Sequence, residues 1–219
     1  MAPSSDGPCG GARQFLERAY TLSGPEDIRA LYRDWAGRYD RDVTEELGLM
    51  SPEIAAELLL TRIEAPAALG PVLDIGCGTG LAGARLRAAG LATIDGLDLS
   101  AEMLAAARRR GIYRELFERD VNEPLPFADG AYDAAISTGV FTLGHVDARP
   151  LVEIVRVIRP GGAFAASIHR DVYVDYGFKN TFDALIKTGC ITDFEVIEKP
   201  LFRSQDDTGR YVVFRRCPT

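Results

Sequence analysis

The sequence predicts an α/β fold in which a doubly wound, seven-stranded, mostly parallel sheet follows an N-terminal helical cap. Short apolar runs alternate with helical stretches from Pro71 onward, and such alternation is typical of a parallel sheet with helices on both faces. The last two apolar runs are separated only by a turn, which predicts an antiparallel hairpin at the C-terminal end of the chain. The residues before Pro71 carry helical patterns without strand patterns.

The N-terminal region is expected to form a helical cap over residues 14–65. Ser23-Gly24-Pro25-Glu26 resembles a capping box. The segment after it places apolar and aromatic side chains on one helix face, namely Ile28, Leu31, Tyr32 and Trp35. Ser51-Pro52 predicts another helix, with Ser51 as N-cap and a proline in the first turn. Residues 1–13 lack the basic start and apolar core of a secretory signal, and they are expected to be a disordered leader.

The main domain is expected to span residues 66–219. Apolar runs that suit buried strands occur at 72–75, 93–97, 114–117, 134–137, 163–168, 194–197 and 211–214. Helical stretches lie between them at 82–89, 101–110, 151–158 and 181–188. The turn of the final hairpin is expected at residues 205–209. These elements complete a seven-stranded sheet.

Length, composition and charge limit the possible partners. The 219 residues suit one domain with a full-sized core, and 47% hydrophobic with 26% charged residues is an ordinary globular balance. A formal net charge of −7 repels a polyanion, so nucleic acid is not an expected partner. No apolar run approaches the ~20 residues that span a bilayer, so no membrane partner is expected.

Cysteine and histidine usage predicts neither disulfides nor a metal site. The cysteines, Cys9, Cys77, Cys190 and Cys217, include no CxxC pair. The chain has only two histidines, which are few ligands for a metal site. A reducing compartment, and therefore a cytoplasmic location, is the expectation. Either a monomer or a homodimer is compatible with the sequence.

The strongest motif is VLDIGCGTG, residues 72–80, in which an apolar strand leads directly into three glycines and then a helix. Glycines at this place permit a tight turn and let the backbone approach a ligand closely. The spacing is GxGxG, because the third glycine of a dinucleotide-binding GxGxxG motif would fall on Leu81. The Lys-Ser/Thr pair of a phosphate-binding P-loop is also missing.

An acidic residue follows the second expected strand. Asp98 lies 18 residues after Gly80, where a carboxylate can accept hydrogen bonds from both ribose hydroxyls of a nucleoside. The alternative is an acid near a helix N-terminus, since Ser100 is placed as the cap of the next helix. Asp120 and Val121 follow the third strand. The carboxylate of Asp120 could accept from an exocyclic amine such as that of adenine, and the backbone amide of Val121 could donate. A surface acid is the alternative for Asp120.

Five segments in order resemble the class I S-adenosylmethionine-dependent methyltransferases, which have a Rossmann-like fold. They are VLDIGCGTG, IDGLDLS, RDV, YDAAISTGVF and IRPGG. The segments YRDWAGRYDRDV, GIYRELFERD and EPLPFADGAYDAAISTGVFTLGHV are, more specifically, similar to the methyltransferase-like proteins of the Williams–Beuren region and their bacterial relatives. The resemblance extends from about Tyr32 to the C-terminus and implies S-adenosyl-L-methionine as cofactor.

The same resemblance implies a set of cofactor-binding residues. Gly76, Cys77 and Gly78 would line the methionine end, and Asp98 would bind the ribose. The adenine would lie against Asp120 and Val121, the sulfonium beside Thr138, and Tyr39 would close over the cofactor from the cap. The remaining members of the expected set, from the same motifs, are Asp74, Gly80 and Leu99.

His145 and His169 are the candidate catalytic residues. Both follow expected strands at the carboxyl edge of the sheet, where open α/β sheets bind ligands. An ordinary histidine pKa near 6.5 suits a general base for a hydroxyl or amine acceptor. The alternatives are that His145 only shapes its loop and that His169 does not contact the substrate.

The expected function is therefore methyl transfer from S-adenosylmethionine to an O, N or C atom of a small molecule. Two alternatives remain open on the sequence alone. One is a non-catalytic module that binds S-adenosylmethionine or S-adenosylhomocysteine, and the other is a nicotinamide-dependent oxidoreductase, which the GxGxG spacing disfavours.

Overall fold

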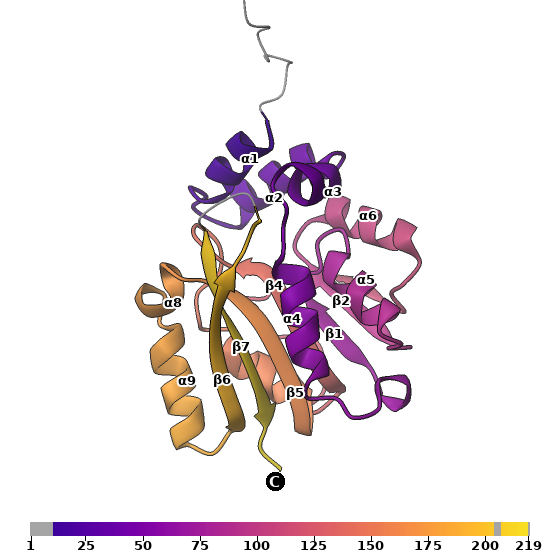
Figure 1. Cartoon of the computed structure of the whole chain (residues 1–219), viewed down its shortest axis with the longest axis vertical. Coiled ribbons are helices and arrows are strands. Elements are labelled where there is room, and N and C mark those ends of the chain that lie inside the picture. Colours follow the sequence, from indigo (N-terminus) through magenta and orange to yellow (C-terminus); the bar gives the residue numbers. More distant parts are fainter. Residues whose placement is uncertain (1–10, 204–206, 219) are drawn as a thin grey trace, which may run out of the picture.

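The computed structural model describes residues 11–203 and 207–218 (Figure 1). Most of the expected leader, residues 1–10, lies outside the described residues, and so does part of the expected turn at 205–209. The first helix, α1 (Ala12–Ala19), begins before the expected start at Gln14. The prediction that the leader extends to residue 13 is therefore wrong at its last two residues, because Ala12 is already buried on the helix.

The sheet has the expected seven strands. They are β1 (Val72–Ile75), β2 (Ile94–Asp98), β3 (Leu116–Glu118), β4 (Tyr132–Phe141), β5 (Ile158–His169), β6 (Ile191–Pro200) and β7 (Thr208–Arg216). Their spatial order is β3-β2-β1-β4-β5-β7-β6. The first five pair in parallel, and β7 pairs antiparallel with both β5 and β6, so the mostly parallel sheet with a C-terminal hairpin is confirmed.

Side-chain alternation along the strands divides the core into two layers. On β4, Ala134 and Ile136 pack in one layer with α4 (Ser51–Leu60) and α5 (Leu81–Ala88). Ala135 faces the opposite layer with α7 (Leu151–Val157) and α9 (Phe178–Lys187). Because successive strand residues point to opposite faces, one run of small apolar residues serves both layers. Figure 1 shows α4 and α5 in front of the strands, and α6 (Ala101–Arg110) lies beside the β2–β3 edge.

Helix α4 packs on the sheet rather than above it. Ala55 and Leu59 are fully buried in the layer that contains β4 and β5, although α4 falls within the segment expected to form the cap. A 3-10 turn at Pro66–Ala68 then leads into β1. The short helix α8 (Val172–Asp175) was not predicted, since four residues carry no periodic pattern.

Two of the expected helix caps are wrong. The N-cap of α2 (Pro25–Trp35) is Gly24, and no side chain caps that helix, so Ser23-Gly24-Pro25-Glu26 is not a capping box. The N-cap of α4 is Met50, and Ser51 is already the first residue of the helix. Ser100 does cap α6, because its hydroxyl accepts a hydrogen bond from the amide of Met103.

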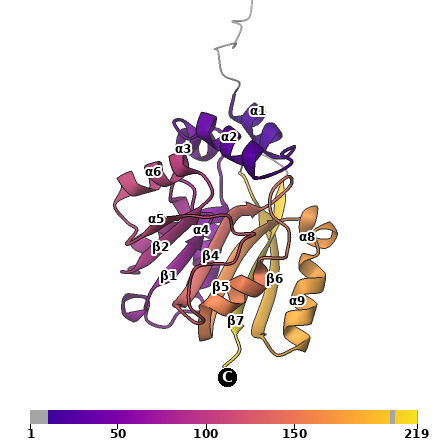
Figure 2. The ribbon, with the colours of Figure 1, turned by 180° about the vertical axis from the view of Figure 1, so that it is seen from behind.

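The cap proper consists of α1, α2 and α3 (Tyr39–Arg41), and α3 continues into a π-helical turn at Asp42–Glu46. Its centre is the fully buried carboxylate of Asp42, which accepts from Trp35 Nε1 at 2.9 Å and from Arg38 Nε at 2.6 Å. The ring of Trp35 stacks on Phe15 of α1 with ring centroids 5.2 Å apart. Figures 1 and 2, from opposite sides, show these helices above one edge of the sheet.

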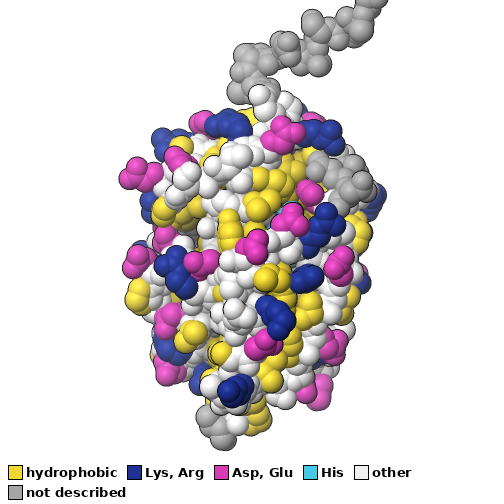
Figure 3. All heavy atoms as spheres, turned by 90° about the vertical axis from the view of Figure 1, so that its left-hand side faces the viewer, with side chains coloured by type: hydrophobic (Ala, Val, Ile, Leu, Met, Phe, Trp, Pro, Cys, Tyr) yellow, Lys and Arg dark blue, Asp and Glu magenta, His cyan; other side chains and the backbone are white. Residues whose placement is uncertain are grey.

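The surface carries charges of both signs. Figure 3 shows the face formed by α8, α9 and β6, where acidic and basic side chains alternate with hydrophobic ones. Val174, Ile186 and Val196 are among the exposed hydrophobic residues. Within the part of the chain that the structure describes, no helix is both long and apolar enough to cross a membrane.

Candidate functional site

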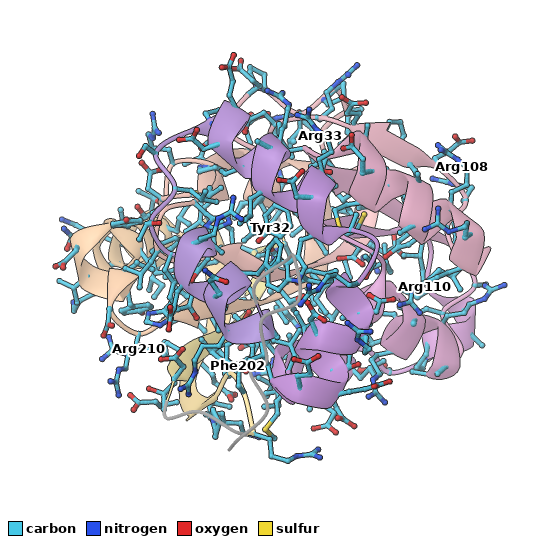
Figure 4. The ribbon with its side chains drawn as sticks, turned by 90° about the horizontal axis from the view of Figure 1, so that it is seen from above. Tyr32, Arg33, Arg108, Arg110, Phe202 and Arg210 are labelled. Carbon is cyan, nitrogen blue, oxygen red and sulfur yellow. The ribbon has the colours of Figure 1, made fainter. Side chains whose placement is uncertain are left out.

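Two adjoining pockets lie between the cap and the carboxyl ends of the parallel strands. We call them the Asp98 pocket and the His169 pocket, after one wall residue of each; they enclose about 820 Å³ and 830 Å³ of empty space, including open solvent. They share one wall, formed by Tyr32, Tyr39, Gly76, Gly78, Thr138, Gly139 and His145. In the view from above, Tyr32 lies near the centre beneath the cap helices, whereas Arg33 and Arg108 lie toward the outside (Figure 4).

The glycines at the end of β1 are required for different reasons. Gly76 and Gly78 both have positive φ, +64° and +54°, where residues with a side chain are strained. A Cβ at Gly76 would come within 2.0 Å of Val140 Cγ2, so Gly76 permits close packing against β4. A Cβ at Gly78 would meet no protein atom within 4 Å and would stand at the wall of the two pockets. The backbone at Gly78 is therefore open to a ligand.

Asp98 connects the end of β2 to this glycine loop. Its carboxylate accepts hydrogen bonds from the amide of Gly78 and from the amide of Ser100, both at 2.8 Å. Burial raises the pKa of Asp98 above its usual value, while these amides act in the opposite direction. Asp98 and Leu99 both line the Asp98 pocket, as do Asp120 and Val121.

The carboxylate of Asp120 also shapes its own turn. Its Oδ1 accepts from the backbone amide and from the side-chain Nδ2 of Asn122, each at 2.9 Å. This leaves Val121 almost fully buried and Asp120 partly exposed at the pocket wall. Residues from three different strand ends, β1, β2 and β3, therefore meet around one pocket.

Two residues of the expected cofactor-binding set, Asp74 and Gly80, lie outside the walls of both pockets. Asp74 is buried beneath the loop, where it accepts from Tyr113 Oη at 2.7 Å and from the amide of Gly83 at 3.0 Å. Burial raises the pKa of Asp74 to about 7. Gly80 is the left-handed N-cap of α5 and lies against Tyr113 and Arg110. Asp74 thus bonds to α5 and Tyr113, Gly80 begins α5, and their role in cofactor binding stays a prediction.

The other expected residues do line the pockets. Cys77 is buried at the wall of the His169 pocket, and burial raises the pKa of its thiol. Thr138 and Tyr39 belong to the shared wall. The ring of Tyr39 packs edge-to-face on Trp35 with centroids 4.9 Å apart. The shared wall thus combines β1, β4 and the cap.

His145 lies on the shared wall in a defined tautomer. Its Nδ1 lies 2.8 Å from the carbonyl oxygen of Leu143, and a carbonyl can only accept, so Nδ1 carries the proton. Its Nε2 then has a lone pair, which accepts from the hydroxyl of Tyr32 at 3.2 Å. Burial lowers the pKa of His145, so the ring is neutral at pH 7.

His169, the last residue of β5, lines only the His169 pocket. Its side chain is 3% exposed, and burial lowers its pKa. The structure thus brings both histidines to the carboxyl edge, but only His145 reaches the wall that the two pockets share.

Several wall residues escaped the sequence-based set. Leu201 and Phe202 follow β6 and reach the His169 pocket from far along the chain. Tyr20 and Ser167 line the same pocket, and neither belongs to a recognisable motif. Tyr32 belongs to the expected aromatic face of the cap, but the YRDW spacing could not show that its hydroxyl meets His145.

The cap is also bound to the glycine loop by charge. Asp40 of α3 accepts from the hydroxyl of Thr79 and pairs with Arg110 at the end of α6. Arg110 Nε donates to the carbonyl of Thr79 at 2.6 Å. Within residues 11–203 and 207–218, no group of three or more His, Cys, Asp or Glu side chains could hold a metal ion.

Replacing Gly78 by valine should abolish binding of S-adenosylhomocysteine, measured by calorimetry. A branched side chain at Gly78 would occupy space at the shared wall, where no protein atom lies now. Gly111→Val is the matched control, because Gly111 has φ +65° and an equally open Cβ position but caps α6 away from both pockets. The control should lose stability and keep affinity; normal binding by the Gly78 variant would remove the loop from the site.

Asp98→Ala should weaken S-adenosylhomocysteine binding by at least about tenfold. Hydrogen bonds to a charged group contribute roughly 1.5–3 kcal/mol each, and the variant also frees the amide of Gly78. Glu118→Ala is the control, since this exposed acid at the end of β3 lines neither pocket. Equal affinity in wild type and a folded Asp98 variant would contradict the ribose-binding role.

Comparison with known proteins places this geometry in a family. The family described as "Methyltransferase domain" matches residues 72–162, from β1 into β5. The human Methyltransferase-like protein 27 is 32% identical over 163 residues, which cover 74% of this chain and 66% of that protein. Demethylmenaquinone methyltransferase of Clavibacter sepedonicus is 35% identical over 151 residues, covering 67% of this chain and 60% of the relative.

A shorter match is to the 18S rRNA (guanine(1575)-N(7))-methyltransferase of Saccharomyces cerevisiae, 44% identical over 66 residues, or 30% of this chain and 24% of that protein. The chain thus spans less than two thirds of each of these curated relatives.

A solved structure from Methanococcus maripaludis, described as an S-adenosyl-L-methionine-dependent methyltransferase, has the same fold. Its TM-score is 0.63 at 17% sequence identity, and the alignment covers 87% of this chain and 94% of that one. The GxGxG loop, the strand order and the family match agree. This chain belongs to the class I S-adenosylmethionine-dependent methyltransferases.

Proposed function

We propose that this protein transfers a methyl group from S-adenosylmethionine to an O, N or C atom of a small molecule held in the His169 pocket. The observation that carries the proposal is the shared wall of the two pockets. A nucleoside bound in the Asp98 pocket would have its attached sulfur at this wall, next to the space for an acceptor.

The residues present fit the cofactor of this family. Asp98 would accept from the ribose hydroxyls, and Asp120 with Val121 would bind the adenine. The open backbone at Gly78 leaves room for the methionine portion. When bound, S-adenosylmethionine supplies an electrophilic methyl group on a positively charged sulfur and leaves as S-adenosylhomocysteine.

His145 is the proposed general base for a hydroxyl or amine acceptor. Its Nε2 has the lone pair and lies on the wall that both pockets share. The proton of the acceptor would pass to Nε2, while the acceptor atom forms its bond to the methyl carbon and the carbon–sulfur bond breaks. In the structure the hydroxyl of Tyr32 donates a hydrogen bond to this nitrogen. The hydroxyl must therefore move away when the acceptor binds.

A small-molecule acceptor is supported by the position of the His169 pocket between the cap and the sheet and by the net charge of the chain. The net charge of −7 disfavours a polyanionic acceptor, although one relative is named for methylation of rRNA. Another is named for demethylmenaquinone, a small molecule. A cytoplasmic location and a monomeric or homodimeric state belong to the same proposal.

The test combines cofactor binding with transfer of a labelled methyl group. Calorimetry should show binding of S-adenosylmethionine and S-adenosylhomocysteine and no binding of NAD. With methyl-labelled cofactor and a cell extract, the label should enter the small-molecule fraction. His145→Phe should lower this transfer by about 100-fold or more, since general-base catalysis typically contributes 10²–10⁴, and should keep affinity for S-adenosylhomocysteine.

Three results would contradict the proposal in different ways. Label in RNA alone would replace the small-molecule acceptor. Binding without any transfer would favour the non-catalytic module. Full transfer by the His145 variant would leave the site in place but remove the base.

We also propose that the cap acts as a lid over the cofactor. Tyr32 and Tyr39 of the cap form part of the shared wall, and the cap reaches the body through the Tyr32–His145 bond and the Asp40–Arg110 ion pair. The Asp40–Arg110 pair is partly exposed, and lids of this kind order around a ligand.

Hydrogen exchange across residues 14–45 should slow sharply when S-adenosylhomocysteine binds. Helix α9, which lines neither pocket, is the internal control and should exchange equally in both states. Identical protection of residues 14–45 with and without the ligand would show a static cap instead.

A further inference from the structure

The two pockets differ in the charge of their walls. Asp98, Arg119 and Asp120 line the Asp98 pocket. Among the described residues, no Asp, Glu, Lys or Arg lines the His169 pocket. Its walls are largely aromatic and aliphatic and include Leu16, Trp35, Val43, Pro52, Leu201 and Phe202. Because an unpaired charge is costly to bury, this pocket suits an uncharged occupant.

His169 adds a hydrogen-bonding ring to these walls, which also carry the hydroxyls of Ser51, Thr138 and Thr142. The backbone defines the tautomer of His169. The amide of Asp171 donates to Nδ1 of His169 at 3.3 Å, so Nδ1 holds a lone pair. The buried ring is neutral, because burial lowers its pKa despite the carboxylates of Asp171 and Asp207 nearby. A neutral imidazole has one proton, and here it must be on Nε2.

This Nε2–H has no partner among the residues that the structure describes. The ring is 3% exposed, so bulk water does not satisfy the donor. Two polar groups of the same wall have other partners: the hydroxyl of Tyr20 donates to Asp207 at 3.2 Å, and Ser167 Oγ accepts from the amide of Gly139 at 3.3 Å. A buried donor without an acceptor is unfavourable, so the pocket is suited to a ligand that supplies one.

The two histidines therefore require opposite hydrogen-bonding groups from a ligand. His145 has a lone pair at Nε2 for a group that carries a hydrogen, and in the structure the hydroxyl of Tyr32 is that group. His169 offers a hydrogen at Nε2 to a group that carries a lone pair. One molecule that satisfies both must combine a hydroxyl, or another group with a hydrogen, with an oxygen that accepts.

We propose that the methyl acceptor is an uncharged molecule with an apolar or aromatic body, a hydroxyl that faces His145 and a carbonyl oxygen that accepts from His169 Nε2–H. This rests on the proposed function and names its substrate class. His169 determines specificity, and it takes no proton during the transfer. Carboxylates and amines of similar shape are rejected, because the described wall holds no opposite charge for them.

The test uses three matched sets of phenols: hydroxyacetophenones, ethylphenols and hydroxybenzoates, each in its ortho, meta and para forms. Binding is measured by calorimetry on protein saturated with S-adenosylhomocysteine. At least one hydroxyacetophenone should bind about tenfold more tightly than the ethylphenol of the same substitution, since they differ in the carbonyl oxygen. The hydroxybenzoates should bind more weakly than the hydroxyacetophenones.

Two variants of His169 link this preference to its donor. His169→Phe keeps a flat ring and removes the N–H, so the hydroxyacetophenone and the ethylphenol should bind equally. His169→Gln places an amide N–H near the position of Nε2 and should keep most of the preference. Both variants should bind S-adenosylhomocysteine like wild type, and this titration also shows that each is folded.

The outcomes separate this inference from the proposed function. If wild type fails to bind S-adenosylhomocysteine, the proposed function fails. If it binds the cofactor product but no hydroxyacetophenone, or binds hydroxybenzoates better, only the substrate class is overturned. A loss of S-adenosylhomocysteine affinity in His169→Phe, with His169→Gln unaffected, would overturn it as well and assign the Nε2–H to the carboxylate of the cofactor.

Discussion

The hydrogen bond from the amide of Gly78 to the carboxylate of Asp98 is the interaction on which the site depends. It joins the loop after β1 to the end of β2, two strands that pair in parallel but are separated in sequence by α5. Gly78 can reach Asp98 only because its backbone adopts φ +54°, and Gly76 allows the approach to Val140. Behind the loop, Asp74 accepts from Tyr113 and from the amide of Gly83 in α5, and Tyr113 lies against Gly80.

The cap completes the site from above through a second buried carboxylate. Asp42 accepts hydrogen bonds from Trp35 and Arg38, and these bonds orient α2 against α3. This places Tyr32 and Tyr39 over the glycine loop. The π-helical turn after α3 keeps Asp42 at this position, since the amide of Leu47 bonds back to the carbonyl of Asp42 at 3.0 Å. The cap is thus ordered internally, and its buried side chains pack in the same hydrophobic cluster as α4 and α5.

The two histidines show how one residue type acquires two chemical roles. Both are neutral because burial lowers the pKa of each ring. A carbonyl next to His145 holds the proton on Nδ1, whereas an amide next to His169 holds a lone pair there. The Nε2 atoms therefore differ: that of His145 accepts and that of His169 carries a hydrogen. A single backbone group beside each ring decides the difference.

The sequence by itself determined the sheet, the hairpin and the glycine loop, because strand periodicity and the GxGxG spacing are local properties of the chain. The strand ends also predicted that Asp98, Asp120 and both histidines would share one edge of the sheet. Local patterns predicted helix caps at Ser23 and Ser51, and both are wrong, because the first residue of a helix also depends on packing. They also could not distinguish Asp74 and Gly80, which support the loop, from Gly78, which borders the pockets. Only the tertiary structure decided the partners of Tyr32, His145 and His169 and the approach of Phe202, since contacts between distant segments depend on how the cap and the hairpin pack on the sheet.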